Sequence, residues 1–109
     1  PVEEVNDILT ERQFQDQIVA EAVDQKWLVF HDHDSRKNNP GYPDLTLVKA
    51  GRIIYAELKR QSKKAKLSPD QEFWIDELSK ASGENVMVAV WRPSDRSYIW
   101  AVLRGKEWG

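Results

Sequence analysis

The fold is decided by one stretch of the sequence, residues 44–59, which reads DLTLVKAGRIIYAELK. Two runs rich in apolar and β-branched residues, 45–48 and 53–58, flank Ala50-Gly51, and a glycine between two such runs is typical of a β-hairpin. If Ala50-Gly51 is a two-residue loop, Lys49 opposes Arg52, and Asp44 opposes Glu57. A bulge at Gly51 would move this register by one residue.

This register gives the hairpin a chemistry. Directly opposed residues share a face of the sheet, with Cβ atoms about 4.5–5.5 Å apart, so Asp44 and Glu57 lie side by side. Strand alternation puts Lys59 on the same face as Glu57. Two opposed carboxylates are destabilising unless a positive charge sits between them. Mg²⁺ favours carboxylate oxygens and retains waters, so the hairpin predicts a site for a hard divalent cation.

A first helix is expected over residues 10–25. Thr10 and Gln13 have the spacing of a capping box, and an apolar stripe follows at spacings of three and four. Glu11 lies seven residues before Ile18 and therefore falls on that stripe. Two interpretations of Glu11 stay open: a first-turn acid favoured by the helix dipole, or an additional metal ligand. The stripe consists of Phe14, Ile18, Ala22 and Val23.

A second helix is expected from Ser68 to the glycine at position 83, because Ser68 can cap it, Pro69 suits its first turn, and glycine favours its end. Gln71 stands three residues after the cap. It can complete a capping box, or it can assist the active site beside Lys59, and both interpretations stay open. Trp74 is expected in the core. Strands are also expected at 27–33, 86–91 and 98–103, with Trp91 and Trp100 in the core, and residues 1–9 as a flexible acidic arm.

Length and composition narrow the function classes. The 109 residues suit one domain. The lack of cysteine excludes disulfides, cysteine zinc sites and thiol catalysis. The sequence has no apolar run of the length of a membrane span and no signal-peptide pattern. These features are compatible with a cytoplasmic protein.

Charge is unevenly distributed along the chain. Residues 1–25 carry seven acids and one base, residues 26–66 ten bases and four acids, and residues 67–109 five bases and seven acids. The middle block is therefore basic between acidic flanks. It is either a solvated lysine-rich loop or a patch that binds phosphates.

Several motifs together resemble a known family. Gly41-Tyr42-Pro43-Asp44 followed by Glu57-Leu58-Lys59 resembles the Pro-Asp…Glu-x-Lys signature of the PD-(D/E)XK nucleases, and more closely its VRR-NUC branch in small stand-alone, phage-type versions. The resemblance covers roughly residues 10–93. Its further matches are Thr10-Glu11, Trp27, His31, Ser35-Arg36, Ser68-Pro69-Asp70-Gln71, Trp74 and Trp91-Arg92-Pro93.

The resemblance implies a single α/β domain over 1–109, with a restriction-endonuclease-like αβββαβ(β) core in which helices flank a central mixed sheet. It implies an endodeoxyribonuclease that depends on Mg²⁺ or Mn²⁺, needs no organic cofactor or membrane, and leaves 5′-phosphates. Asp44, Glu57 and the Leu58 carbonyl would hold the metal, and Lys59 and Gln71 would assist. Branched DNA such as a four-way Holliday junction, a homodimer, and the cytoplasm (the host's, for a phage protein) are implied too.

A rival interpretation is a non-catalytic DNA-binding or assembly module that keeps the nuclease fold. A further set of residues, all from the basic middle block, is expected to contact DNA phosphates in either case and to position the DNA without reading its sequence. A His31-x-His33 metal site lacks a third nitrogen ligand and is less favoured. The phosphate-contact set is His31, Ser35, Arg36, Lys37, Arg60, Lys63, Lys64 and Lys66.

Overall fold

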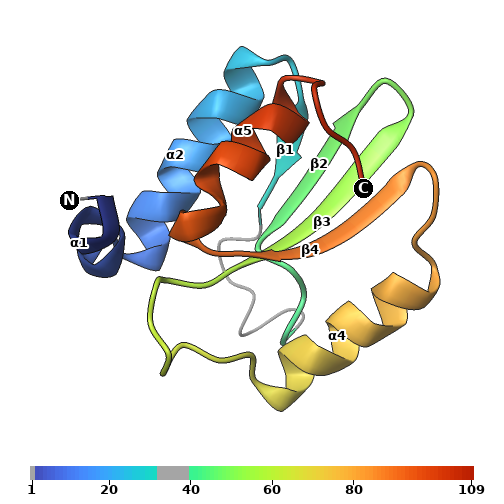
Figure 1. Cartoon of the computed structure of the whole chain (residues 1–109). Coiled ribbons are helices and arrows are strands. Elements are labelled where there is room, and N and C mark those ends of the chain that lie inside the picture. The colour runs from blue at the N-terminus through green and yellow to red at the C-terminus, as the bar shows by residue number, and fades with distance from the viewer. Residues whose placement is uncertain (1, 32–39) are drawn as a thin grey trace.

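The computed structural model describes residues 2–31 and 40–109. They form a four-stranded sheet in the order β1-β2-β3-β4, in which β3 and β4 are parallel and the other neighbours antiparallel. Helices flank the sheet, which confirms the expected mixed-sheet architecture (Figure 1). The elements are α1 (Val2–Ile8), α2 (Glu11–Asp24), β1 (Leu28–Phe30), β2 (Leu45–Lys49), β3 (Arg52–Leu58), α4 (Pro69–Lys80), β4 (Val86–Trp91), the 3₁₀ turn η1 (Pro93–Asp95) and α5 (Arg96–Leu103).

The central hairpin β2–β3 has the expected register. Lys49 pairs with Arg52, and Leu45 pairs with Ala56. The turn residues Ala50 and Gly51 have φ angles of 51° and 79°, and two successive positive φ angles are the mark of a tight two-residue turn whose twist matches the strands. The bulge at Gly51 is therefore not formed.

The core lies between the sheet and helices α2 and α5, which run beside one another across one face (Figure 1). One row of paired residues, Val29, Leu47, Ile54 and Met87, crosses all four strands on this face. From α2, three stripe residues are buried as expected, whereas Val23 is 57% exposed. The stripe prediction was wrong for Val23 because one residue of helix turns the side chain about 100° away from Ala22.

The C-terminal segment is a helix where a strand at 98–103 was expected. Ile99, Val102 and Leu103 are fully or almost fully buried, and spacings of three and four put them on one face of α5. The strand prediction was wrong, because a short apolar run can fit the period of a helix as well as that of a strand. The sheet therefore ends at β4. Trp91 is buried as expected, and Trp100 packs against the core from α5 while only partly buried.

Residues 2–8 of the expected flexible arm form a helix that contacts the rest of the domain. Helix α1 covers Val2–Ile8, and the side chain of Asn6 is buried. Arg96 donates one hydrogen bond to Asn6 Oδ1 (3.2 Å) and another to Gln17 Oε1 (3.1 Å). Arg96 therefore fastens α1 and α2 to the start of α5.

The expected strand at 27–33 is shortened to β1, and residues 32 and 33 lie outside the described part of the chain.

Both capping boxes are confirmed. Thr10 and Ser68 each accept a hydrogen bond from the backbone N–H three residues on, and Gln13 and Gln71 complete the boxes. Helix α4 follows the second box and contacts β4, yet none of its residues is buried. Trp74 was expected in the core and is instead half-buried, donating from Nε1 to the Pro40 carbonyl at 3.1 Å.

No helix in residues 2–31 and 40–109 has the length and apolar character needed to cross a membrane.

Candidate active site

The hairpin brings Asp44 and Glu57 together at the end of the sheet. Leu45 pairs with Ala56, so Asp44, one residue before β2, lies across from Glu57 on β3. The backbone N–H of Leu58 donates to Asp44 Oδ2 at 2.8 Å. This bond fixes the Asp44 carboxylate against the last residues of β3 and leaves its other oxygen for a ligand.

Glu57 is the most unusual group of this site. It is 1% exposed, and neither carboxyl oxygen has a hydrogen-bond partner among the described residues. Burial and the neighbouring Asp44 carboxyl raise the pKa of Glu57 to about 9, while Lys59 and the Leu58 N–H act in the opposite direction. An unsatisfied buried acid is costly, so the carboxyl is held in a position that a cation would stabilise.

Lys59 completes the triplet. Its backbone N–H donates to the Trp91 carbonyl at 3.0 Å, which carries the β3–β4 pairing one residue beyond β3. The residue is 9% exposed, and its charge is near enough to lower the pKa of Glu57. A positive charge is thus built into the site beside the two acids.

The donor set fits a hard divalent cation, because two carboxylates and nearby backbone oxygens are the ligands that Mg²⁺ and Mn²⁺ prefer. Within residues 5–31 and 40–109, no cluster of three or more His, Asp or Glu side chains suited to a metal is formed. Glu11 is exposed on the first turn of α2 and does not join Asp44 and Glu57 in such a cluster, and neither does the half-buried His31. His33 lies outside the described residues.

Gln71 takes the capping interpretation. Its Oε1 accepts from the Ser68 N–H at 2.9 Å, and its own N–H donates to Ser68 Oγ at 3.2 Å. These two bonds do not use the side-chain nitrogen Nε2. A role for that nitrogen in the active site stays a prediction.

The loop that carries Asp44 is fastened to the start of α4. Gly41 has a φ of +88°, and a Cβ there would overlap the backbone carbon and oxygen of Asp70. The Tyr42 ring stands edge-on to Trp74, with centroids 5.0 Å apart. Sequence reasoning missed this junction, although the glycine three residues before Asp44 was a signal for a close backbone approach.

The basic segment after β3 is exposed at Arg60, Lys63, Lys64 and Lys66, as a phosphate-contacting surface requires. Sequence reasoning gave no role to Arg92, which follows β4 and donates hydrogen bonds to this segment. Its only signal was the Trp91-Arg92-Pro93 match. Ser35, Arg36 and Lys37 lie outside the described residues.

The raised pKa of Glu57 predicts how metal-free stability depends on pH. In the unfolded chain this acid ionises near its ordinary value, whereas in the folded protein it keeps its proton up to about 9. Between these values the folded state binds more protons, so stability falls as pH rises. We expect the melting temperature in EDTA to drop between about pH 5.5 and 8.5. Glu57→Gln should make the melting temperature depend less on pH. An equal dependence in the variant would contradict the raised pKa of Glu57.

Comparison with known proteins agrees with this architecture. A four-stranded mixed sheet between helices, with paired carboxylates on its central hairpin, defines a restriction-endonuclease-like α/β domain. The family model of the VRR-NUC domain matches residues 3–94. A solved structure described as a "VRR_NUC domain protein" has a TM-score of 0.64 and 20% sequence identity, over 90% of this chain and 88% of that chain. A comparison with curated proteins found no match.

The chain therefore belongs to the VRR-NUC family, as the motifs indicated. Membership makes it a nuclease-type domain, with DNA as the substrate class.

Proposed function

We propose that this protein is a divalent-metal-dependent DNA endonuclease that hydrolyses phosphodiester bonds. The observation that carries the proposal is the buried Glu57 carboxyl, which has no hydrogen-bond partner in the described part of the chain and lies beside Asp44. Asp44, Glu57 and the Leu58 carbonyl would hold Mg²⁺ or Mn²⁺. Such a cation, when bound, offsets the phosphate charge and makes water a better nucleophile.

The protein's own groups supply the rest of the chemistry. The Lys59 ammonium holds the attacking water or balances the negative charge that grows on the phosphoryl oxygens. Gln71 Nε2 assists from the first turn of α4. In-line attack expels the 3′ oxygen and leaves a 5′-phosphate.

The direct test is a cleavage assay on labelled DNA with Mg²⁺, with Mn²⁺ and with EDTA. We expect cutting with either metal and none in EDTA, with a 5′-phosphate on the product. Binding without cutting under all three conditions would favour the rival, a non-catalytic DNA-binding module.

DNA is gripped through its backbone in this proposal. His31, Arg60, Lys63, Lys64 and Lys66 contact phosphates, which fix position without reading sequence. Ser35, Arg36 and Lys37 belong to the same proposed surface.

The lysines give a quantitative prediction. Replacing Lys63, Lys64 and Lys66 together by glutamine should reduce the dependence of log affinity on log salt by nearly three units, because each phosphate contact contributes about 0.9. The loss should be similar for unrelated duplex sequences. Titrations at several salt concentrations measure it, and an unchanged slope would show that these lysines form only a solvated loop.

The substrate we propose is branched DNA, and the acting species a homodimer. A four-way junction has approximate two-fold symmetry, so two sites related by a two-fold axis would meet opposed strands. We place this activity in the cytoplasm, which is that of the host if the protein is encoded by a phage.

We expect light scattering at micromolar concentration to give the mass of a dimer, and four-way junctions to be cut in paired nicks faster than linear duplex. A monomer that cuts both substrates equally fast would refute the junction proposal and leave the nuclease proposal standing.

A further inference from the structure

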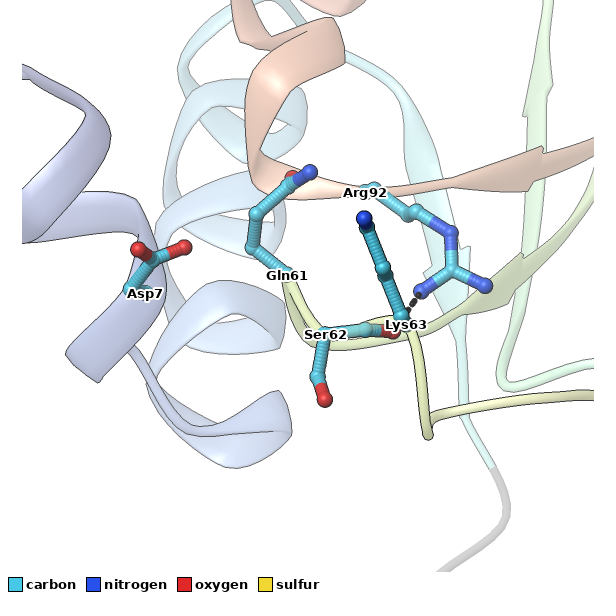
Figure 2. Close-up of a pocket in the computed structure, with 5 residues that line it drawn as sticks. All are labelled: Asp7, Gln61, Ser62, Lys63 and Arg92. Atoms are coloured by element: carbon cyan, nitrogen blue, oxygen red, sulfur yellow. Dashed lines mark hydrogen bonds between the residues drawn. The ribbon is translucent and has the colours of Figure 1, made fainter.

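Arg92 fastens the basic loop, residues 60–66, by its main chain. Its Nη1 donates to the carbonyls of Arg60 at 2.8 Å and Ser62 at 3.3 Å, and its Nη2 donates to the carbonyl of Ala65 at 2.6 Å. The bond to Ser62 is drawn in Figure 2. One guanidinium therefore holds three points of a loop that starts immediately after Lys59.

A second contact joins the same two segments. The Ser94 N–H donates to Gln61 Oε1 at 3.0 Å. Arg92 and Ser94, which flank Pro93, therefore both form hydrogen bonds with the loop. Because β3 and β4 are parallel, the segments that leave them start at the same end of the sheet, where Lys59 also lies. The shape of the basic loop is thus coupled to the end of the sheet that holds the candidate active site.

The positive charge of Arg92 stays available to an anion. The hydrogen-bond partners of its guanidinium are neutral carbonyls, and no carboxylate in the described residues lies within ion-pair distance of that group. The Asp95 carboxylate accepts from the Arg92 backbone N–H instead. The residue is only half-buried. Lys63 is exposed on the basic loop and lies beside Arg92, where it adds a second positive charge (Figure 2).

These groups line a pocket of about 370 Å³ between the basic loop and α1, formed by Asp7, Gln61, Ser62, Lys63 and Arg92 (Figure 2). The far wall is fixed, because the Asn6 side chain next to Asp7 is buried and accepts from Arg96. Two cations and two neutral polar side chains outweigh the single carboxylate of Asp7. An anionic group with hydrogen-bond acceptors on several sides fits this lining, and a phosphodiester is such a group.

We propose that this pocket is a second phosphate subsite, which receives a DNA backbone phosphate flanking the one that is cut, and that Arg92 is the positioning residue that builds it. Lys63 contacts the phosphate, and Arg92 holds the loop so that Lys63 faces the pocket. The Asp7 carboxylate repels the bound phosphate and therefore weakens its binding. This inference rests on the proposed DNA nuclease function and adds to it the grip on DNA beyond the metal site.

The positioning role can be tested without DNA, because the loop contains four trypsin sites, after Arg60, Lys63, Lys64 and Lys66. In Arg92→Gln, cleavage at these sites should be at least about tenfold faster, the scale of losing one hydrogen bond to a charged group. Arg104→Gln is the matched control, because Arg104 forms an ion pair with Glu21 (2.8 Å) and does not contact the loop. In this variant trypsin should cleave the loop at the wild-type rate. Equal rates in Arg92→Gln and wild type would overturn the positioning role.

The subsite itself is tested by duplex binding in Ca²⁺, on wild type, Arg92→Gln, Lys63→Gln and the double variant. Each single change should weaken binding at least about fivefold, a typical loss for a charged contact, and the double variant should lose less than the sum of the two single losses, because Arg92 acts in part through Lys63. Asp7→Asn should tighten binding. Full additivity of the two losses, or an unchanged affinity in Asp7→Asn, would overturn the subsite.

Turnover separates this inference from the function on which it rests. At saturating DNA and Mg²⁺, Arg92→Gln should retain kcat within about a few-fold while KM rises, because the lost interaction is uniform binding. If Arg92→Gln does not fold, Arg92→Lys keeps the charge but cannot span three carbonyls, and it should show the same KM rise. A wild type that binds DNA with these couplings but never cuts it would refute the nuclease and leave the subsite intact.

Discussion

Asp44→Asn and Glu57→Gln should each lower Mg²⁺-dependent DNA cleavage by at least about a hundredfold, the scale of losing a main electrostatic group of an active site. Each change removes a negative oxygen ligand from the proposed cation site. The two carboxyls act on one site, so the double variant should be scarcely worse than either single one. Single-turnover cleavage of a labelled substrate measures the rates.

Binding supplies the control for these variants. Duplex affinity in Ca²⁺ should change little, because the basic loop is intact and lies outside the hairpin. Glu57→Gln should also remain folded, since it replaces a carboxyl that already keeps its proton in the metal-free protein. If both variants still cut DNA in Mg²⁺ at near the wild-type rate, the assignment of the metal ligands is refuted.

Gly41→Ala is expected to have the second largest effect. The position has a φ of +88°, which costs an alanine roughly 1–2 kcal/mol, and the added methyl would overlap the Asp70 backbone. Neither backbone can yield cheaply, because Asp70 lies in the capped first turn of α4. The loop that carries Asp44 must therefore shift. We expect a lower melting temperature and a loss of cleavage together.

Gly51→Ala is a matched control for this change. Its φ is +79°, close to that of Gly41, but no atom lies within 4 Å of the added Cβ. Gly51→Ala should lower the stability only through the unfavourable φ angle of the alanine. Each kcal/mol lost lowers the melting temperature by about 4–8 °C in a domain near this size. The cleavage rate of this variant should not change. Equal melting temperatures in the two alanine variants would show that the contact of Gly41 with Asp70 does not constrain the site.

The hairpin could be predicted from the sequence because its information is local. The turn residues set the register, the register sets the pairing, and the pairing puts Asp44 across from Glu57. The two helix starts were predictable for the same reason, since a capping box is complete within four residues. Which acid would be buried without a partner was not readable, because that depends on packing between distant elements.

The errors fall where the signal was ambiguous or distant. In residues 96–103 the apolar positions fit a strand and a helix alike, and packing against α2 selected the helix. The contact of α1 with the start of α5 was not predicted, because its hydrogen bond joins Asn6 to Arg96, residues far apart in the sequence. The role of Arg92 arises in the same way, from contacts to main-chain atoms about thirty residues earlier.

The way in which Arg92 holds the basic loop bears on how this protein can diversify. Its three acceptors are backbone carbonyls, which every amino acid provides. The shape of the loop is therefore uncoupled from the identity of its outward side chains. Lys63, Lys64 and Lys66 can be exchanged for other residues without a new scaffold, so selection or an engineer can retune the strength and salt range of DNA binding while the hairpin chemistry stays constant.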